Sequence, residues 1–282
     1  MTESNLRLLR PASVPVPRRV LLLHGLGAGD NIWHLYRALA GPDLELWGVR
    51  LPWRFDGETD WAYDPGCFRV VADVLGESFD AVVAHSFAAN VLLELLATQR
   101  HPQPEATVLL APFYRPRPGA FHWDTAEYYL NEFQRFLESG IAARRLMRGR
   151  SRLDGAVLND MGRHVRDRIG AYGWLRFFET YLRTPWLRLD QVRGPCLVVA
   201  GERDTAASPR DAGDLAAALP GSRLTVLPDT GHFAMVEAAA PFAAALDAFF
   251  HQTLNTRPLH AVPDVRAAAL AVPPTYPEEL LT

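Results

Sequence analysis

The sequence predicts an α/β fold in which a mostly parallel β-sheet is covered by helices on both faces. Short apolar runs alternate along the chain with segments of helical periodicity, which is typical of parallel strands joined by crossover helices. The runs are also continuously apolar, as expected for strands that are buried on both faces. With 282 residues, 49% of them hydrophobic, the chain is long enough to bury such a core.

The elements follow one another in a regular order along most of the chain. The expected strands are the apolar runs 18–25, 44–52, 79–86, 106–112, 194–204 and 222–229. Helices are expected between or after them, at about 31–40, 68–76, 87–98, 208–219 and 237–251. No internal repeat is visible, so we expect one sheet rather than a stacked array.

The first of these helices carries local signals of its own. Asp30 or Asn31 is placed to cap its N-terminus, since short polar side chains accept hydrogen bonds from the free amides of the first turn. Trp33, Tyr36 and Leu39 then recur at helical spacing. We therefore expect a capped helix that runs to about residue 40.

The alternation is interrupted between residues 113 and 188, where no strand is convincing. This segment reads as several helices, such as 126–140 and 174–183, and it holds 14 of the 29 aromatic residues of the chain. An insertion of this size between two strands of such a sheet is commonly a lid. We expect its aromatic side chains, Tyr128, Tyr129, Phe133 and Phe136, to form the packing face of a cap helix, part of which roofs a pocket.

These patterns divide the chain into three parts. Residues 1–112 and 189–253 are expected to form the core, and residues 113–188 the helical cap. Residues 254–282 form a C-terminal extension with five prolines, within which 264–272 is a candidate short helix.

Ser86 stands where the strand at 79–86 passes directly into a helix. In this context a strained turn exposes a serine hydroxyl at the carboxyl edge of the sheet. Ligands of open α/β sheets bind at that edge, and the positive end of the following helix points there. Ala84 and Ala88 stand where glycines are usual, and we expect the turn to form with a little more crowding. By itself this pattern also fits an ordinary helix-capping serine.

Two further residues supply what a nucleophilic serine requires. Asp204 comes just past the strand at 194–204, and His232 lies in the loop before the last helix. Both are therefore expected at the same sheet edge as Ser86. A serine nucleophile needs a base, and the base needs an acid that orients it, so the three residues form a candidate catalytic triad.

The stretch HGLGAG, which begins at His24, follows the first predicted strand. Acyl transfer needs backbone N–H donors aimed at the developing oxyanion, and we expect these from Leu26 and Phe87. The stretch lacks the glycine register of a phosphate-binding loop. We expect the substrate to contact residues of these loops and of the cap, namely His24, Gly25, Trp123, Tyr129, Phe133 and Phe233.

Taken together, these ordered motifs resemble the α/β-hydrolase superfamily. They are HGLG after the first strand, AHSFA at the elbow, a cap before the last two strands, GERD, and then GHF. The resemblance covers roughly residues 18–252. It implies that Ser86 is the nucleophile, Asp204 the triad acid and His232 the general base. The chain departs from the family in its short N-terminus, so the usual opening antiparallel strands are expected to be reduced or absent.

The leading functional prediction is hydrolysis of an ester or thioester with an apolar or aromatic acyl group. Three alternatives remain open: an acyltransferase or cyclase with the same triad, a carbon–carbon bond hydrolase, and a non-catalytic protein that binds a small ligand. The cap carries 14 arginines against eight acidic residues, which makes an acyl carrier protein or a coenzyme A thioester a candidate partner.

Composition excludes several other classes. A net charge of −3 argues against nucleic-acid binding, and no apolar stretch is long enough for a membrane helix. Two distant cysteines, Cys67 and Cys196, fit a reducing compartment without a disulfide, so we expect a cytoplasmic protein. No metal site or cofactor is expected.

Overall fold

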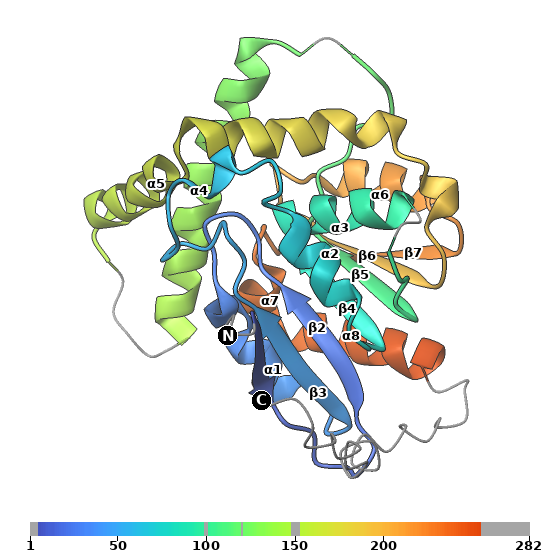
Figure 1. The fold of residues 1–282 in the computed structure, drawn as a ribbon. Helices are drawn as coiled ribbons and strands as arrows, with labels where there is room; N and C mark the ends of the chain where they lie inside the picture. The colour runs from blue at the N-terminus through green and yellow to red at the C-terminus, as the bar shows by residue number, and fades with distance from the viewer. Residues whose placement is uncertain (1–4, 99–100, 120, 148–152, 255–282) are drawn as a thin grey trace, which may run out of the picture.

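Seven strands of the described chain form one sheet that is parallel except at one edge (Figure 1). The computed structural model describes residues 5–98, 101–119, 121–147 and 153–254. The strand order is β1-β3-β2-β4-β5-β6-β7. In chain order the strands are β1 (Leu6–Arg10), β2 (Arg18–Leu23), β3 (Leu44–Val49), β4 (Ala81–His85), β5 (Ala106–Leu110), β6 (Cys196–Gly201) and β7 (Ser222–Leu227). The predicted α/β fold with a mostly parallel sheet is confirmed.

The edge strand β1 is the one strand of the described chain that the sequence does not reveal. It pairs antiparallel with β3, whereas all other neighbouring strands run parallel. Its side chains are half exposed, so the sequence has no continuous apolar run from which this strand could be predicted. The opening antiparallel strands are therefore reduced to one. The six predicted strands are all present, each a few residues shorter than expected.

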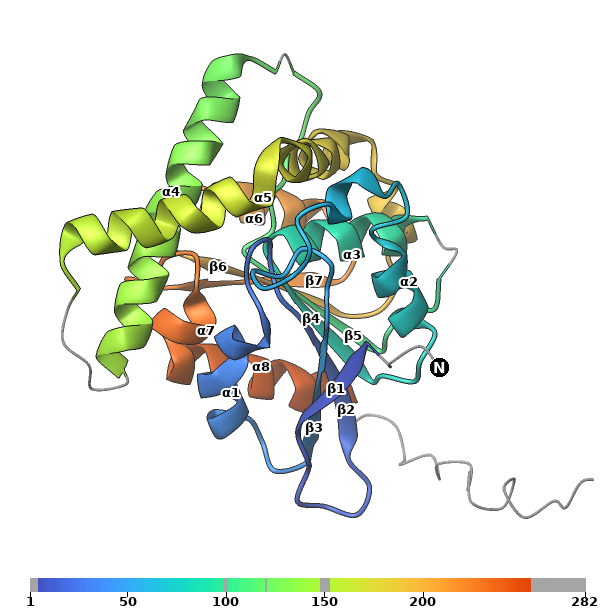
Figure 2. The same ribbon diagram turned by 60° about the vertical axis from the view of Figure 1, so that its left-hand side comes forward.

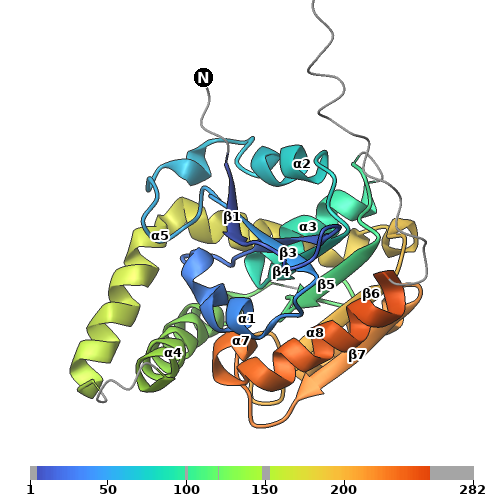
Figure 3. The same cartoon turned by 90° about the horizontal axis from the view of Figure 1, so that it is seen from below.

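Helices cover both faces of the sheet. Figure 3 shows α1 (His34–Leu39) and α8 (Ala239–Leu254) on one face, and α2 (Arg69–Leu75) and α3 (Phe87–Ala97) on the other. α6 (Pro209–Ala218) packs on β6 and β7, and the short α7 (Ala234–Glu237) leads into α8. Short 3-10 turns are η1 (Asp30–Trp33), η2 (Trp61–Tyr63), η3 (Thr184–Trp186) and η4 (Leu189–Gln191).

The segment predicted as one capped helix near residues 31–40 is built differently. It is a 3-10 turn followed by α1, and neither Asp30 nor Asn31 caps it. The carboxylate of Asp30 instead turns inward, to the position that a side chain on Gly48 of β3 would occupy. Leu39, expected on the same face as Trp33 and Tyr36, is largely exposed because α1 ends there.

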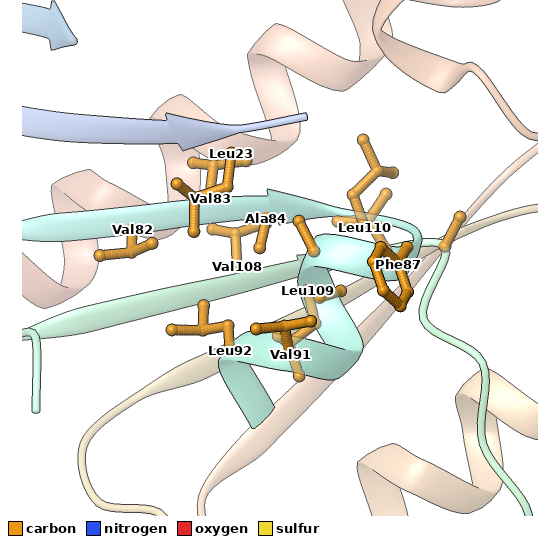
Figure 4. Close-up of a cluster of buried hydrophobic side chains, with 14 of the residues drawn as sticks. Leu23, Val82, Val83, Ala84, Phe87, Val91, Leu92, Val108, Leu109 and Leu110 are labelled. Atoms are coloured by element: carbon orange, nitrogen blue, oxygen red, sulfur yellow. The ribbon is translucent and has the colours of Figure 1, made fainter. Parts of the chain in front are cut away.

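The buried core around the centre of the sheet fixes the position of the end of β4. Every residue of β4 and β5 is buried, as the continuous apolar runs predict. Figure 4 shows their side chains packed with those of α3 and β2, among them Leu23, Val83, Leu92 and Leu109. The end of β4 is therefore anchored on all sides by close-packed apolar groups.

Two long helices interrupt the sheet between β5 and β6. They are α4 (Trp123–Met147) and α5 (Gly155–Arg183), and Figures 1 and 2 show them crossing at one end of the sheet. Both are longer than the predicted helices 126–140 and 174–183, and α5 bends at Gly170, where φ is 68°. A helical cap before the last two strands is thus confirmed, while the division of the chain at residues 113 and 189 stays a prediction.

Two other expectations concern the rest of the chain. Cys67 and Cys196 are both buried, and neither takes part in a disulfide. Within the described residues, no helix combines the length and the apolar character that a membrane span requires. The C-terminal extension, including the short helix expected at 264–272, lies outside the described residues except for Leu254.

Candidate active site

Ser86 occupies a sharp turn between β4 and α3. Its backbone has φ 58° and ψ −124°, a conformation that residues other than glycine rarely adopt. The turn ends at Phe87, whose ring Figure 4 shows beside the first turn of α3. Ala84 and Ala88, on either side of the turn, are both fully buried. The strained turn therefore forms with alanine at both positions where glycine is usual.

His232 and Asp204 meet Ser86 at the same edge of the sheet. His232 Nε2 lies 2.9 Å from Ser86 Oγ, and His232 Nδ1 lies 2.7 Å from Asp204 Oδ2. All three residues are at most 6% exposed. The other carboxylate oxygen of Asp204 accepts hydrogen bonds from the amides of Ala206 and Ala207. Residues far apart in the sequence thus form one continuous hydrogen-bonded chain.

The loop that carries His232 is fixed from both sides by one carboxylate. Glu237, in α7, accepts hydrogen bonds from the amides of Gly231 and Phe233 at 2.8 and 3.0 Å. The loop also passes close to β6, because a Cβ on Gly201 would lie 2.2 Å from the Gly231 carbonyl oxygen. No role was predicted for Glu237, although an acid five residues after the histidine, on a short helix, is a usable signal.

The predicted oxyanion donors lie beside the serine. Leu26 and Phe87 both line the small cavity at Ser86. Within the described residues, no backbone acceptor is found for either amide, whereas the next two amides after Leu26 donate to the carbonyls of Trp53 and Gly25. Gly25 brings this loop close: a Cβ there would be 3.0 Å from the Ser86 Cβ. Leu26 and Phe87 therefore lie at the serine with amides that donate to no backbone carbonyl of the described residues, which is compatible with the predicted oxyanion donors.

Two buried histidines flank the turn. Burial lowers the pKa of His24 to about 4, and burial together with the neighbouring His232 holds the pKa of His85 well below its ordinary value. His85 Nε2 lies 3.1 Å from the backbone carbonyl oxygen of His232, so this nitrogen carries the proton and donates it. His24 was predicted to contact the substrate, and no role was predicted for His85.

An aromatic cavity of about 10 Å³ lies in front of Ser86. Tyr129 and Phe133 line it, which brings two of the predicted substrate-binding residues to the serine. The remaining lining residues, apart from those at the turn and its loop, are Phe113, Phe136, Trp174, Phe177 and Ala206. Most of these were missed because their direction depends on how the cap helices are rotated. The cavity is large enough for about one water molecule.

Three predicted substrate-binding residues are placed elsewhere. Trp123 is 84% exposed and lines a separate groove between α4 and α5, because it opens α4 beyond the part that covers the serine. His24 is buried behind the loop, where its Nδ1 lies 3.0 Å from the Gly25 carbonyl oxygen. Phe233 packs against His85 and Phe136 rather than lining the cavity. None of these three lines the cavity at Ser86, and their contact with substrate stays a prediction.

No group of three or more histidine, cysteine, aspartate or glutamate side chains in the described chain is arranged to hold a metal ion.

Comparison with known proteins agrees with this architecture. The model of the alpha/beta hydrolase family matches residues 20–245. Among solved structures, MenH from S. aureus is 17% identical with a TM-score of 0.58, covering 90% of this chain and 100% of its own. An esterase from Thermogutta terrifontis is 16% identical (TM-score 0.59; 88% and 93% covered), and the enol-lactonase from Burkholderia xenovorans LB400 is 18% identical (TM-score 0.55; 87% and 95% covered). No curated protein matches the sequence.

Proposed function

This chain belongs to the alpha/beta hydrolase family, and we propose that it cleaves an ester or thioester with an apolar or aromatic acyl group. The observation that carries the proposal is the hydrogen-bonded chain from Ser86 Oγ through His232 to Asp204, with Leu26 and Phe87 beside it. A nucleophile, a base, an acid that orients the base and oxyanion donors are the groups that acyl transfer needs.

The reaction follows from this arrangement. Ser86 Oγ attacks the carbonyl carbon while His232 Nε2 takes its proton, and the carbonyl oxygen becomes an oxyanion between the two amides. His232 then returns the proton to the leaving alcohol or thiol as the acyl-enzyme forms. A water molecule, deprotonated by the same histidine, then attacks the acyl carbon, and His232 gives that proton to Ser86 Oγ as the acyl–oxygen bond breaks and the acid leaves. Asp204 keeps the imidazole in the productive tautomer throughout.

The cavity supports an apolar acyl group. Besides Ser86, its lining combines seven aromatic side chains with Leu26 and Ala206, and it contains no charged residue. A substrate needs far more room than about 10 Å³, since binding pockets for small molecules span about 300–1,000 Å³. Substrate must therefore enter by displacing cap side chains, and closure over it would exclude bulk water from the acyl-enzyme.

Covalent labelling tests the proposal. The folded protein is incubated with a fluorophosphonate probe, and the adduct is mapped by mass spectrometry. We expect phosphonylation of Ser86, and we expect Ser86→Ala to lose the label and to lower kcat on an aryl ester by about 10⁴-fold or more.

The matched control is Ser78→Ala, which removes an exposed hydroxyl in the loop before β4. This variant is expected to label and to turn over like the parent protein. Absence of label at Ser86 in folded protein, or an unchanged kcat in Ser86→Ala, would overturn the proposed function.

A further inference from the structure

One face of cap helix α4 contacts His232 and the residue that follows Asp204 at successive turns. Tyr128, Glu132, Phe136 and Gly140 are spaced four residues apart, so they lie in a row along the helix. We refer to these four residues as the α4 row. A helix that merely covers a cavity need not contact the groups behind it, so the contacts of this row are informative.

The first half of the row holds the loop of Asp204. The Tyr128 hydroxyl donates to the backbone carbonyl of Thr205 at 2.5 Å, and the Thr205 hydroxyl donates to the Glu132 carboxylate. Thr205 directly follows Asp204, and the next amide, that of Ala206, donates to the Asp204 carboxylate. Two cap side chains thus hold the peptide unit beside the acid.

The second half of the row lies against His232 and the residue after it. The Phe136 ring stacks on the His232 imidazole, with centroids 4.1 Å apart and planes at 23°. A Cβ on Gly140 would lie 2.7 Å from the Phe233 ring, so the helix backbone at Gly140 packs directly against that ring. The same helix face therefore contacts His232 itself and Thr205, the residue that follows Asp204.

Glu132 is the unusual member of the row. It is 4% exposed, although its ionic partner Arg135 reaches into solvent. Burial of a carboxylate is costly unless its oxygens are hydrogen-bonded. Thr205, itself an exposed residue of the core, provides such a bond, so its hydroxyl satisfies a carboxylate that is otherwise buried.

We propose that Tyr128, Glu132 and Phe136 are positioning residues, through which closure of the cap sets Asp204 and His232 in their reactive geometry. The inference rests on the proposed function and specifies how its site is regulated. Closure of the cap and completion of the acid–base pair are then a single event. With α4 displaced, the loop of Asp204 loses two of its hydrogen bonds and His232 loses the ring that lies on its face.

Thr205 offers the sharpest test because it does not line the cavity. Thr205→Val removes the hydroxyl and keeps the shape, whereas Thr205→Ser keeps the hydroxyl. We expect Thr205→Val to lower kcat on a small aryl ester about tenfold, the effect of losing one hydrogen bond to a charged group. KM should stay within about twofold of the parent value, and Thr205→Ser should recover kcat to within about threefold.

A double-mutant cycle shows whether the effect passes through Glu132. Glu132→Leu should lower kcat to a similar extent, and Glu132→Leu with Thr205→Val should be no slower than the slower single variant, since both remove the same bond. The control is Glu127→Gln, an exposed acid on the same helix that faces away from Thr205. It should leave kcat unchanged.

The outcomes separate this inference from the proposed function. If the parent protein labels at Ser86 but Thr205→Val keeps the parent kcat, or if Thr205→Ser is as slow as Thr205→Val, the positioning role is overturned and the proposed function stands. If the parent protein does not label, both fail. Should Thr205→Val not fold, Thr205→Ala makes the same deletion without the branched methyl group, and the same criteria apply.

Discussion

The strain at Ser86 shows how single residues determine this site. A backbone with φ 58° at a residue with a side chain costs about 1–3 kcal/mol, and it persists only where the surroundings enforce it. Here the enforcing surroundings are the fully buried β4 and the first turn of α3. Alanine at positions 84 and 88 is compatible with the turn because both side chains are completely enclosed without displacing it.

Gly201 is a second residue whose identity the site requires. A Cβ at this position would lie 2.2 Å from the Gly231 carbonyl oxygen and 2.4 Å from that of Thr230. Gly201→Ala must therefore push away the loop that carries His232. We expect a loss of about 1–3 kcal/mol in the free energy of unfolding, typical of overpacking, and a fall in kcat of about 10²-fold through misplacement of the base. Urea unfolding and aryl-ester kinetics measure the two effects.

The control for this substitution is Gly213→Ala. Gly213 lies inside α6, and its Cβ would meet only Leu224 at an ordinary 3.8 Å. Alanine there should stabilise the protein by about 0.5–1 kcal/mol, since alanine loses less backbone entropy than glycine in a helix. Equal stability and activity for Gly201→Ala and the parent protein would contradict the crowding argument.

Residues at strand ends were predictable, and residues on the cap were not. Ser86, Asp204 and His232 were placed together because parallel strands bring their carboxyl ends to one edge, whatever the details of packing. The place of Trp123 depends instead on where α4 lies over the core and how it is rotated, which no local pattern encodes. Burial of a carboxylate at Glu132 has the same origin, since its partner Thr205 lies far away in the sequence.

At the scale of elements, β2 and β4 lead into buried histidines that remain neutral in the folded protein. The pKa of His24 is lowered to about 4, and that of His85 also lies well below its ordinary value, in both cases chiefly through burial. Below a pH of about 6.5 the unfolded chain binds protons that the folded chain does not. Stability should therefore be complete above that pH and fall as the pH decreases, by up to about 1.4 kcal/mol per pH unit for each histidine.

This prediction is checked by urea unfolding between pH 7.5 and pH 5. In His24→Gln one of the two groups no longer titrates, so its free energy of unfolding should fall less steeply with decreasing pH than that of the parent protein. The comparison cancels the contribution of the carboxylates, which both proteins share. His122→Gln, which replaces an exposed histidine, is the control. If the free energy of unfolding changes with pH in the same way in His24→Gln and in the parent protein, His24 does not contribute to the pH dependence of stability.

Strands and helices were predicted well where burial alone determines the residue pattern. A strand that is buried on both faces, such as β4, requires a continuous run of apolar residues, and this run is visible in the sequence. Helix limits depend on competing terms, so α5, which is kinked at the non-helical Gly170, begins well before the helix that was predicted at 174–183. The edge strand β1 forms by pairing with β3, a long-range contact that its own polar pattern does not reveal.

At the scale of the whole molecule, arginines join the cap to the core. Arg168 of α5 donates to the carbonyls of Phe55 and Gly57, and Arg176 donates to that of Ala62. Other described cap arginines have acceptors as well: Arg115, Arg135, Arg166, Arg183 and Arg188. Seven of the 14 cap arginines, whose surplus suggested a carrier-protein or coenzyme A thioester, are thus engaged within the chain. That partner stays a prediction.

Two hollows lie on either side of Trp174. One is the cavity of about 10 Å³ at Ser86, and the other is the open groove of about 610 Å³ between α4 and α5, which Trp123 also lines. Trp174 contributes to both linings, and its ring packs edge-on against Phe133 inside the cap. The indole therefore acts as a wall between the serine and a volume that falls in the usual range for a ligand site.

Removal of that wall should change which acyl chains the protein accepts. Trp174→Ala joins the cavity to the groove, so an acyl chain that extends past the wall gains a place to lie. Each additional methylene buried there contributes about 0.8 kcal/mol. We therefore expect the ratio of kcat/KM for the p-nitrophenyl ester of octanoate to that of butyrate to rise at least about tenfold, which corresponds to burial of about two of the four methylenes by which octanoate is longer. Trp123→Ala changes only the outer groove and should leave the ratio near the parent value. An unchanged ratio in Trp174→Ala would mean that the acyl chain takes another path through the cap, whereas an equal rise in both variants would place the chain in the groove of the parent protein already.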